Sequence, residues 1–156
     1  NLFNAGIRPA VNVGISVSRV GGAAQTKAMR QVAGRLKLDM ASYRELAAFA
    51  QFGSDLDKAT LNQLNRGRRM QEILKQPQYA PVSLAHQTMT IFAGTYGYAD
   101  EVPVEKMRQW ELDVVKFLDQ SYPELSKEIV EKKQITPGTE KKLREALTTF
   151  KSTWQA

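Results

Sequence analysis

Apolar side chains recur every three or four residues through most of this chain, and that spacing restricts the possible folds more than any other feature. It puts the apolar residues on one face of an α-helix. The clearest stripe consists of Met107, Trp110, Val114, Phe117 and Leu118. Several amphipathic helices in one chain bury their stripes against each other, so residues 26–156 are predicted to form a helical bundle.

Capping residues predict where these helices begin and end. Asp39 and Ser42 are favourable N-cap residues, so we expect a helix boundary there, followed by a second, short helix. Asp55 and Asp57 fit the start of the next helix, where the helix dipole favours acids.

Three glycines interrupt the helical pattern. Gly67 lies inside a predicted helix, where glycine costs about 1 kcal/mol relative to alanine. Gly94 and Gly97 follow a later apolar stripe and predict a loosely ordered helix end.

One segment near the N-terminus has a different period. From residue 9 to residue 18 the side chains alternate, with Val11, Val13, Ile15 and Val17 on one face. This period of two, with β-branched residues after a proline, predicts a strand. A solitary strand leaves its backbone unpaired, so we expect its sheet to lie in sequence upstream of residue 1. The opposite face carries Asn, Gly and Ser, which fits close approach by a ligand or by tightly packed backbone.

Charge is concentrated in the same part of the chain. The 156 residues carry a net charge of +6, and the first 38 residues contain six bases and no acid. These bases are Arg8, Arg19, Lys27, Arg30, Arg35 and Lys37. They indicate either a solvated helix face or a surface that meets an anion or an acidic protein.

Few residues could carry chemistry. The chain has no Cys and one His, which leaves no thiolate nucleophile and no multi-histidine metal site, and we expect no metal ligands. No Gly-Lys-Ser/Thr sequence ends a glycine-rich phosphate loop, so the chain alone is not a self-sufficient enzyme. Arg19 follows the predicted strand directly, where its guanidinium could clamp a phosphate or form a structural ion pair.

Four runs of sequence resemble a known family. Residues 6–21, GIRPAVNVGISVSRVG, look like the alpha or beta subunits of F-type rotary ATP synthases. Residues 24–34, 48–57 and 74–79 are of the alpha type, and the resemblance weakens after about residue 98. Gly22 stands where the family typically has serine.

The resemblance implies a fold and an organisation. The chain would hold the end of a truncated P-loop nucleotide-binding domain at 1–25 and a C-terminal helical bundle domain at 26–156. The fold class is therefore mainly α, with one orphan β-strand. The implied function is that of the non-catalytic alpha subunit of a proton-translocating ATP synthase. That subunit alternates with catalytic beta subunits around the central stalk (gamma) subunit.

The resemblance also implies site residues. Arg19 corresponds to an arginine finger that reaches the catalytic site of the neighbouring beta subunit. The residues around the adenine of a regulatory ATP or ADP, bound with Mg in the intact subunit, would be Phe3, Arg8, Pro9, Gln76 and Gln78. The residues facing the stalk would be Phe52, Gly53, Ser54 and Asp55.

Further expectations follow about location and partners. The isolated chain would be inactive and bind no cofactor. It would meet the membrane only through the assembled complex, on the cytoplasmic face of the bacterial inner membrane or the matrix side of the mitochondrial one. We expect no nucleic-acid partner. The alternative is a stand-alone basic helical domain that binds nucleic acid or protein through the first 38 residues.

Overall fold

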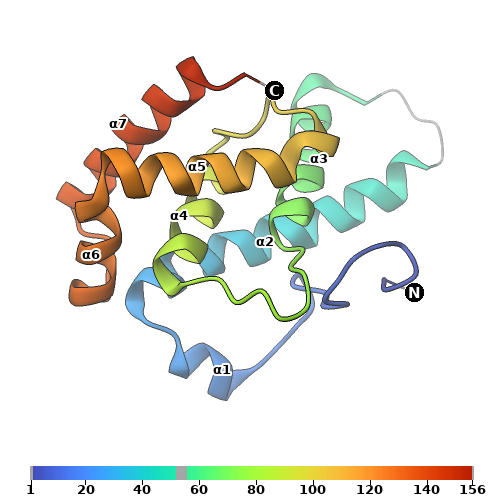
Figure 1. Ribbon diagram of the computed structural model, residues 1–156. Helices are drawn as coiled ribbons and strands as arrows, with labels where there is room; N and C mark the ends of the chain where they lie inside the picture. The colour runs from blue at the N-terminus through green and yellow to red at the C-terminus, as the bar shows by residue number, and fades with distance from the viewer. Residues whose placement is uncertain (1, 52–55, 156) are drawn as a thin grey trace.

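The computed structural model describes residues 2–51 and 56–155, which form seven α-helices and one short 3₁₀ helix (Figure 1). In chain order these are α1 (Arg19–Ala24), α2 (Lys27–Ala50), α3 (Lys58–Ile73), α4 (Leu84–Thr95), η1 (Val104–Lys106), α5 (Met107–Ser121), α6 (Pro123–Lys132) and α7 (Pro137–Thr153). The predicted mainly helical fold is confirmed.

Helix α4 lies at the centre of the bundle. It packs against α2, α3, α5 and α6, and nine of its 12 residues are buried. The buried hydroxyls of Thr88 and Thr90 donate to the carbonyls of Leu84 and His86, one turn back, at 2.8 Å each. These bonds satisfy polar groups that would otherwise make a central helix costly.

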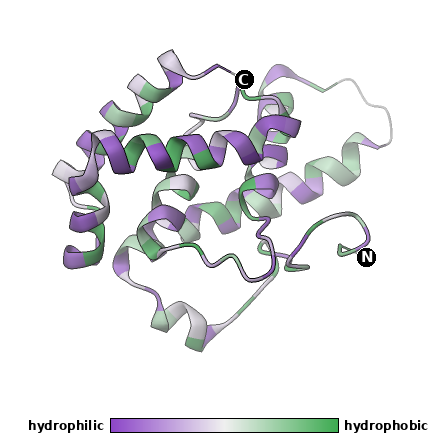
Figure 2. Ribbon diagram, in the orientation of Figure 1, coloured by the Kyte–Doolittle hydropathy of each residue, from purple (hydrophilic) through white to green (hydrophobic). Residues whose placement is uncertain are grey.

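The strongest predicted stripe forms the core of α5. Trp110 is 1% exposed and packs edge-on against Phe150 of α7, with 6.3 Å between ring centres. Trp154 is partly buried, and its indole N–H donates to Asp113 at 2.9 Å. Figure 2 shows hydrophobic and hydrophilic residues sharing each helix of the bundle, as amphipathic helices require.

The predicted boundary at Asp39 and Ser42 is wrong, because α2 continues through both residues to Ala50. Asp39 lies on the helix surface, with an oxygen 3.8 Å from Arg35 Nε, a spacing of one turn that a helix tolerates. N-cap residue types do not end a helix when nothing breaks the backbone after them. The expected acid at the start of α3 is confirmed, since Asp57 accepts bonds from the N–H groups of Ala59 and Thr60.

Two glycines let α3 pack closely against its neighbours. A Cβ on Gly67 would lie 2.3 Å from the ring of Tyr43 on α2. A Cβ on Gly94 would lie 2.3 Å from the sulfur of Met70. The conformational cost of glycine in a helix is therefore offset by close contact between helices.

The end of α4 is closed by a pair of backbone hydrogen bonds, in contrast to the loose end that its glycines predict. Gly97 has a φ of +85°, which glycine adopts without strain. Its N–H donates to the carbonyl of Gly94, and that of Tyr98 donates to Ala93 at 3.0 Å. This pair of bonds is a Schellman motif, which satisfies the last carbonyls of the helix.

The N-terminal segment, residues 2–18, lies against α2 and α3 without regular structure. The predicted strand at 9–18 is not formed, because no strand occurs in the described residues to pair with it. Close approach to other backbone is confirmed at Gly14, where a Cβ would lie 2.9 Å from the Cα of Ala41.

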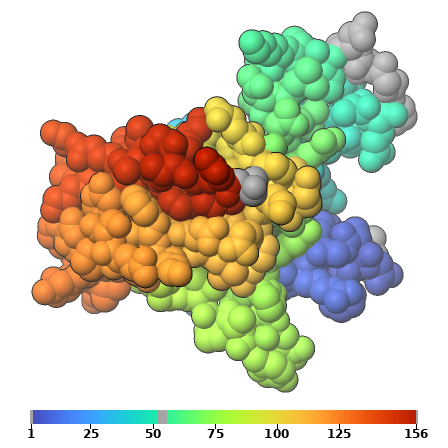
Figure 3. All heavy atoms as spheres, turned by 45° about the horizontal axis from the view of Figure 1, so that its top comes forward, coloured from blue at the N-terminus to red at the C-terminus, as the bar shows by residue number. Residues whose placement is uncertain are grey.

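The outer surface is uneven. In Figure 3 the end of α2 and the start of α3 stand away from the body formed by α5, α6 and α7.

No helix within residues 2–51 and 56–155 is long and apolar enough to cross a lipid bilayer.

Candidate functional site

The N-terminal segment meets the loop after α3 at a basic hollow of about 290 Å³. The backbone N–H of Gln76 donates to the carbonyl of Arg8 at 2.9 Å, which ties the two segments together. The lining residues of this basic hollow are Gly6, Arg8, Glu72, Lys75, Gln76, Pro77 and Arg108. Three of them are bases and one is an acid, so the basic hollow favours a ligand with negative charge.

Acidic neighbours hold two of these bases in place. Lys75 Nζ lies 2.6 Å from a carboxylate oxygen of Glu72, and Arg108 Nη1 lies 2.8 Å from a carboxylate oxygen of Glu111. Glu111 is buried, and burial raises its pKa above the usual range, while Arg108 acts in the opposite direction. Arg8 has no acidic partner among the described residues, and its guanidinium lies 4.2 Å from the ring centre of Phe3.

The structure brings together some of the residues predicted to surround an adenine and separates others. Arg8 and Gln76 line the basic hollow, and the Gln76 side chain donates to the carbonyl of Ala80 at 2.8 Å. Phe3 does not line the basic hollow but contacts it through Arg8, whose guanidinium lies against the Phe3 ring. Pro9 lines a different, apolar cavity. Gln78 is exposed in the loop between α3 and α4 and does not line the basic hollow.

Arg19 is the first residue of α1 and is exposed. The preceding residue, Ser18, caps the helix by accepting from Gly21 N–H at 2.9 Å. No ion pair joins Arg19 to another described residue, so the structure gives no support to an ion-pair role within the chain. The predicted stalk-facing residues, Phe52, Gly53, Ser54 and Asp55, lie outside the described residues.

Sequence reasoning missed three charged residues of the basic hollow. Glu72 and Lys75 are three residues apart on one helical turn, and that spacing alone could have indicated a pair. Arg108 comes from α5, more than 30 residues further along the chain, and no local pattern points to it.

His86, Asp119 and Ser126 form a polar cluster whose geometry fits a structural role. His86 Nε2 lies 2.9 Å from a carboxylate oxygen of Asp119, and the hydroxyl of Ser126 donates to the same carboxylate at 3.3 Å. The serine and the histidine thus share the acid as partner, which is not the serine–histidine arrangement of a nucleophilic site. The cluster joins α4, α5 and α6.

The fold and the site therefore define a helical domain with a basic hollow on its surface. Residues 25–150 match the family described as ATP synthase alpha/beta chain, C terminal domain. The match covers most of the chain, so the chain belongs to this family.

The chain is also similar in sequence to longer proteins of known name. The chain is 56% identical over 151 residues to the ATP synthase subunit alpha of Aquifex aeolicus, covering 97% of this chain and 30% of that protein. It is 56% identical over 156 residues to the ATP synthase subunit alpha of Desulfovibrio desulfuricans, covering 100% of this chain and 31% of that protein. The chain thus spans about a third of the length of the relatives it matches.

Proposed function

We propose that this chain acts as the C-terminal part of a non-catalytic alpha subunit in a proton-translocating ATP synthase. The observation that carries the proposal is the 56% identity to proteins named ATP synthase subunit alpha, over 97–100% of the chain. The partners in this proposal are the beta subunits and the central stalk. The complex is peripheral to the cytoplasmic face of a bacterial inner membrane, or to the matrix side of the mitochondrial one.

Arg19 is the arginine finger in this proposal. Its exposure, and the absence of an ion pair with other described residues, leave the guanidinium available to a neighbouring subunit. In the beta catalytic site it meets the γ-phosphate and offsets charge that develops during phosphoryl transfer. Fingers of this kind contribute about 10³–10⁵-fold to the rate.

Arg8 and Gln76 contribute to the regulatory nucleotide site of the same subunit. The positive charge of the basic hollow suits ATP or ADP, and the free carbonyl oxygen of the Gln76 side chain suits a purine amino group. Gln78, Phe3 and Pro9 complete the proposed set, and Mg is held by other parts of the intact subunit. Residues 52–55 face the stalk. Without a phosphate loop, the 156 residues alone neither bind ATP tightly nor hydrolyse it.

The test builds Arg19→Ala, Arg19→Lys and Arg8→Ala into a whole alpha subunit, reconstituted with beta and the stalk. Arg19→Ala is expected to lower multisite hydrolysis at least about 10³-fold and to change nucleotide binding little, because a finger acts mainly in the transition state. Arg19→Lys keeps the charge without the planar fork, so it restores only part of the rate.

Arg8→Ala is the contrasting variant, since it removes an exposed arginine that the proposal assigns to the regulatory nucleotide site and not to the catalytic one. It should lower nucleotide retention on alpha and leave turnover within about tenfold. Each assembly is checked for intact stoichiometry first. Near-normal turnover of an intact Arg19→Ala assembly would show that Arg19 is not a finger.

A further inference from the structure

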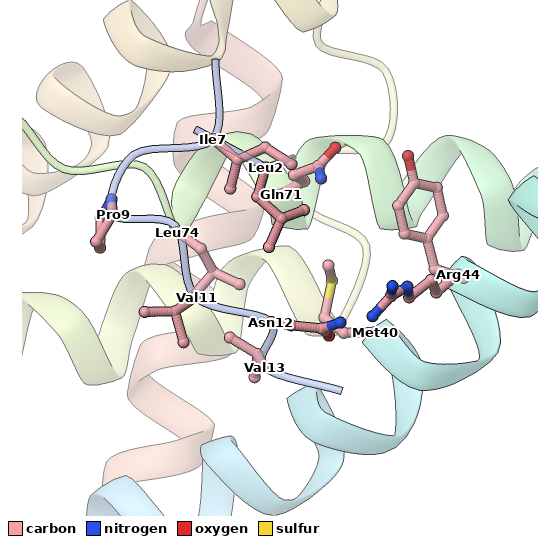
Figure 4. A pocket seen from close by; sticks show the side chains of 11 residues that line it. Leu2, Ile7, Pro9, Val11, Asn12, Val13, Met40, Arg44, Gln71 and Leu74 are labelled. Atoms are coloured by element: carbon pink, nitrogen blue, oxygen red, sulfur yellow. The ribbon is translucent and has the colours of Figure 1, made fainter. Parts of the chain in front are cut away.

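A second cavity, of about 310 Å³, lies between the N-terminal segment and helices α2 and α3 (Figure 4). This apolar cavity lies apart from the basic hollow, since the two have no lining residue in common. Its size falls at the lower end of the range of about 300–1,000 Å³ found for small-molecule sites.

The walls of the apolar cavity come from both sides of the contact. The N-terminal segment contributes Ile7, Val11 and Val13, α2 contributes Met40, and Leu74 comes from the C-cap of α3. In Figure 4 the side chains of these residues surround one space. An apolar body in the cavity would be removed from water where it contacts these side chains, which stabilises binding in proportion to the area buried.

The polar groups of the apolar cavity include one cation and no acid. Arg44 is exposed, and Figure 4 shows its guanidinium directed toward the side chain of Asn12. Gln71 adds a second amide. No hydrogen bond or ion pair joins these three side chains to another described residue, so their donors are free to meet a ligand.

We propose that the apolar cavity binds a small amphipathic acid, with its apolar body between the N-terminal segment and α2–α3. The carboxylate accepts hydrogen bonds from Arg44 and Asn12. Charge decides the class of ligand, because the lining residues include a base that no acid neutralises. A neutral amphiphile of equal size gains the apolar contact but not the charge-assisted hydrogen bond.

Such a ligand would hold the N-terminal segment against the bundle. Residues 9–13 have little regular hydrogen bonding of their own, with the N–H of Val11 bonded to the carbonyl of Pro9. A ligand that contacts Val11, Val13 and Met40 together favours the docked arrangement by mass action. This inference does not depend on the proposed function, since it concerns binding to the chain itself.

The test titrates the 156-residue chain with decanoate, and in parallel with decan-1-ol, by isothermal calorimetry. We expect saturable decanoate binding with one site per chain and at least about tenfold weaker binding of the alcohol. Arg44→Ala should weaken decanoate about tenfold and leave decan-1-ol unchanged. Arg68→Ala, which removes an exposed arginine of α3 outside the apolar cavity, should change neither by more than about twofold.

A cavity-filling variant and an amide-exchange measurement test the location of the ligand independently. Met40→Trp places a larger side chain in the apolar cavity and should abolish binding of both compounds while circular dichroism stays unchanged. If that variant does not fold, amide exchange of the unmodified chain decides, because decanoate should slow exchange within residues 9–13. The proposal is overturned by equal affinity for acid and alcohol, by equal losses in Arg44→Ala and Arg68→Ala, or by no slowing of exchange. Stronger binding to phosphatidylglycerol vesicles than to free decanoate would also overturn it.

Discussion

Valine and isoleucine side chains are buried in one region of this molecule and exposed in another. In the bundle, Val114 and Ile129 are fully buried, whereas in and just after the N-terminal segment Ile15, Val17 and Val20 are 67%, 79% and 82% exposed. Composition therefore does not explain the difference. The bundle is built from helices that satisfy their own backbone, and burial of their side chains then needs only a neighbouring helix.

A strand depends on a partner in a way that a helix does not. Its N–H and C=O groups point sideways and are satisfied by a neighbouring strand. The alternation at 9–18 is as regular as any helical stripe in the chain, yet it produces no strand here. Regular patterning predicts an element only where its hydrogen-bond partners are present.

Amide exchange should show the largest contrast between the two regions. We expect α5, with Val114 and Leu118 buried, to exchange only through global unfolding. The amides of Val13, Ile15 and Val17 have no backbone acceptor in the described residues, so they should exchange close to the rate of unstructured peptide. The measurement is exchange followed by mass spectrometry or NMR. Uniform protection in a demonstrated monomer would remove the contrast.

Truncation of side chains should give the next largest difference. Trp110→Ala removes a side chain that is 1% exposed, and we expect it to lower the free energy of unfolding by about 3–5 kcal/mol. Val17→Ala is the matched change in the N-terminal segment, where the side chain is 79% exposed, and it should stay within about 0.5 kcal/mol. Urea denaturation of both variants measures this. Equal losses would mean that the segment is part of the cooperative core.

Glycines test how closely the helices of the bundle approach each other. Gly67→Ala puts a methyl group 2.3 Å from the Tyr43 ring, so we expect a loss of about 1–3 kcal/mol. Gly34→Ala in α2 meets nothing within 4 Å and should instead stabilise by up to about 1 kcal/mol through helix propensity. Thermal unfolding of the two variants gives the sign of each change. A stabilising Gly67→Ala would show that α2 and α3 can move apart at little cost.

The helices of the bundle could be predicted because their signal is local. The stripe around Trp110 and the acid at Asp57 each lie within a few residues of the backbone that they organise. The boundary at Asp39 and the loose end at Gly97 failed for a related reason. Whether an N-cap residue starts a helix, or a glycine closes one tightly, depends on the dihedral angles of the following residues, and side-chain type alone does not determine these.

The basic hollow was less predictable from the chain itself. Arg8 and Gln76 were expected to lie together only through the family resemblance, and the structure joins them by a backbone hydrogen bond. Arg108 also lines the basic hollow and comes from α5. The apolar stripe of that helix predicts which side chains are buried, but not what its polar side chains contact. Sites assembled from distant segments need the tertiary fold before their members can be recognised.

Glu128 offers a smaller, pH-dependent test of the bundle. Its carboxylate accepts from the buried Thr139 hydroxyl at 2.7 Å and from Lys142 at 3.1 Å, and Lys132 lies 3.4 Å away. The Thr139 hydrogen bond, followed by the two lysines, lowers the pKa of Glu128 from 4.5 to about 2. A depressed carboxyl pKa stabilises the fold above the unfolded value, and this stability is lost as pH falls through the folded value.

We therefore expect Glu128→Gln to lower the free energy of unfolding by about 1–2 kcal/mol at pH 7, most of it through Thr139, since solvent screens the lysine pairs. The difference from the unmodified chain should shrink between pH 4.5 and about 2, because the unmodified carboxyl becomes protonated over that interval. Glu131→Gln on the same helix is the control, and it should lie within about 0.5 kcal/mol of the unmodified chain at every pH. Urea denaturation at a series of pH values gives both curves. A Glu128→Gln deficit that stays constant from pH 7 to pH 3 would mean that the carboxylate charge does not stabilise the contact between α6 and α7.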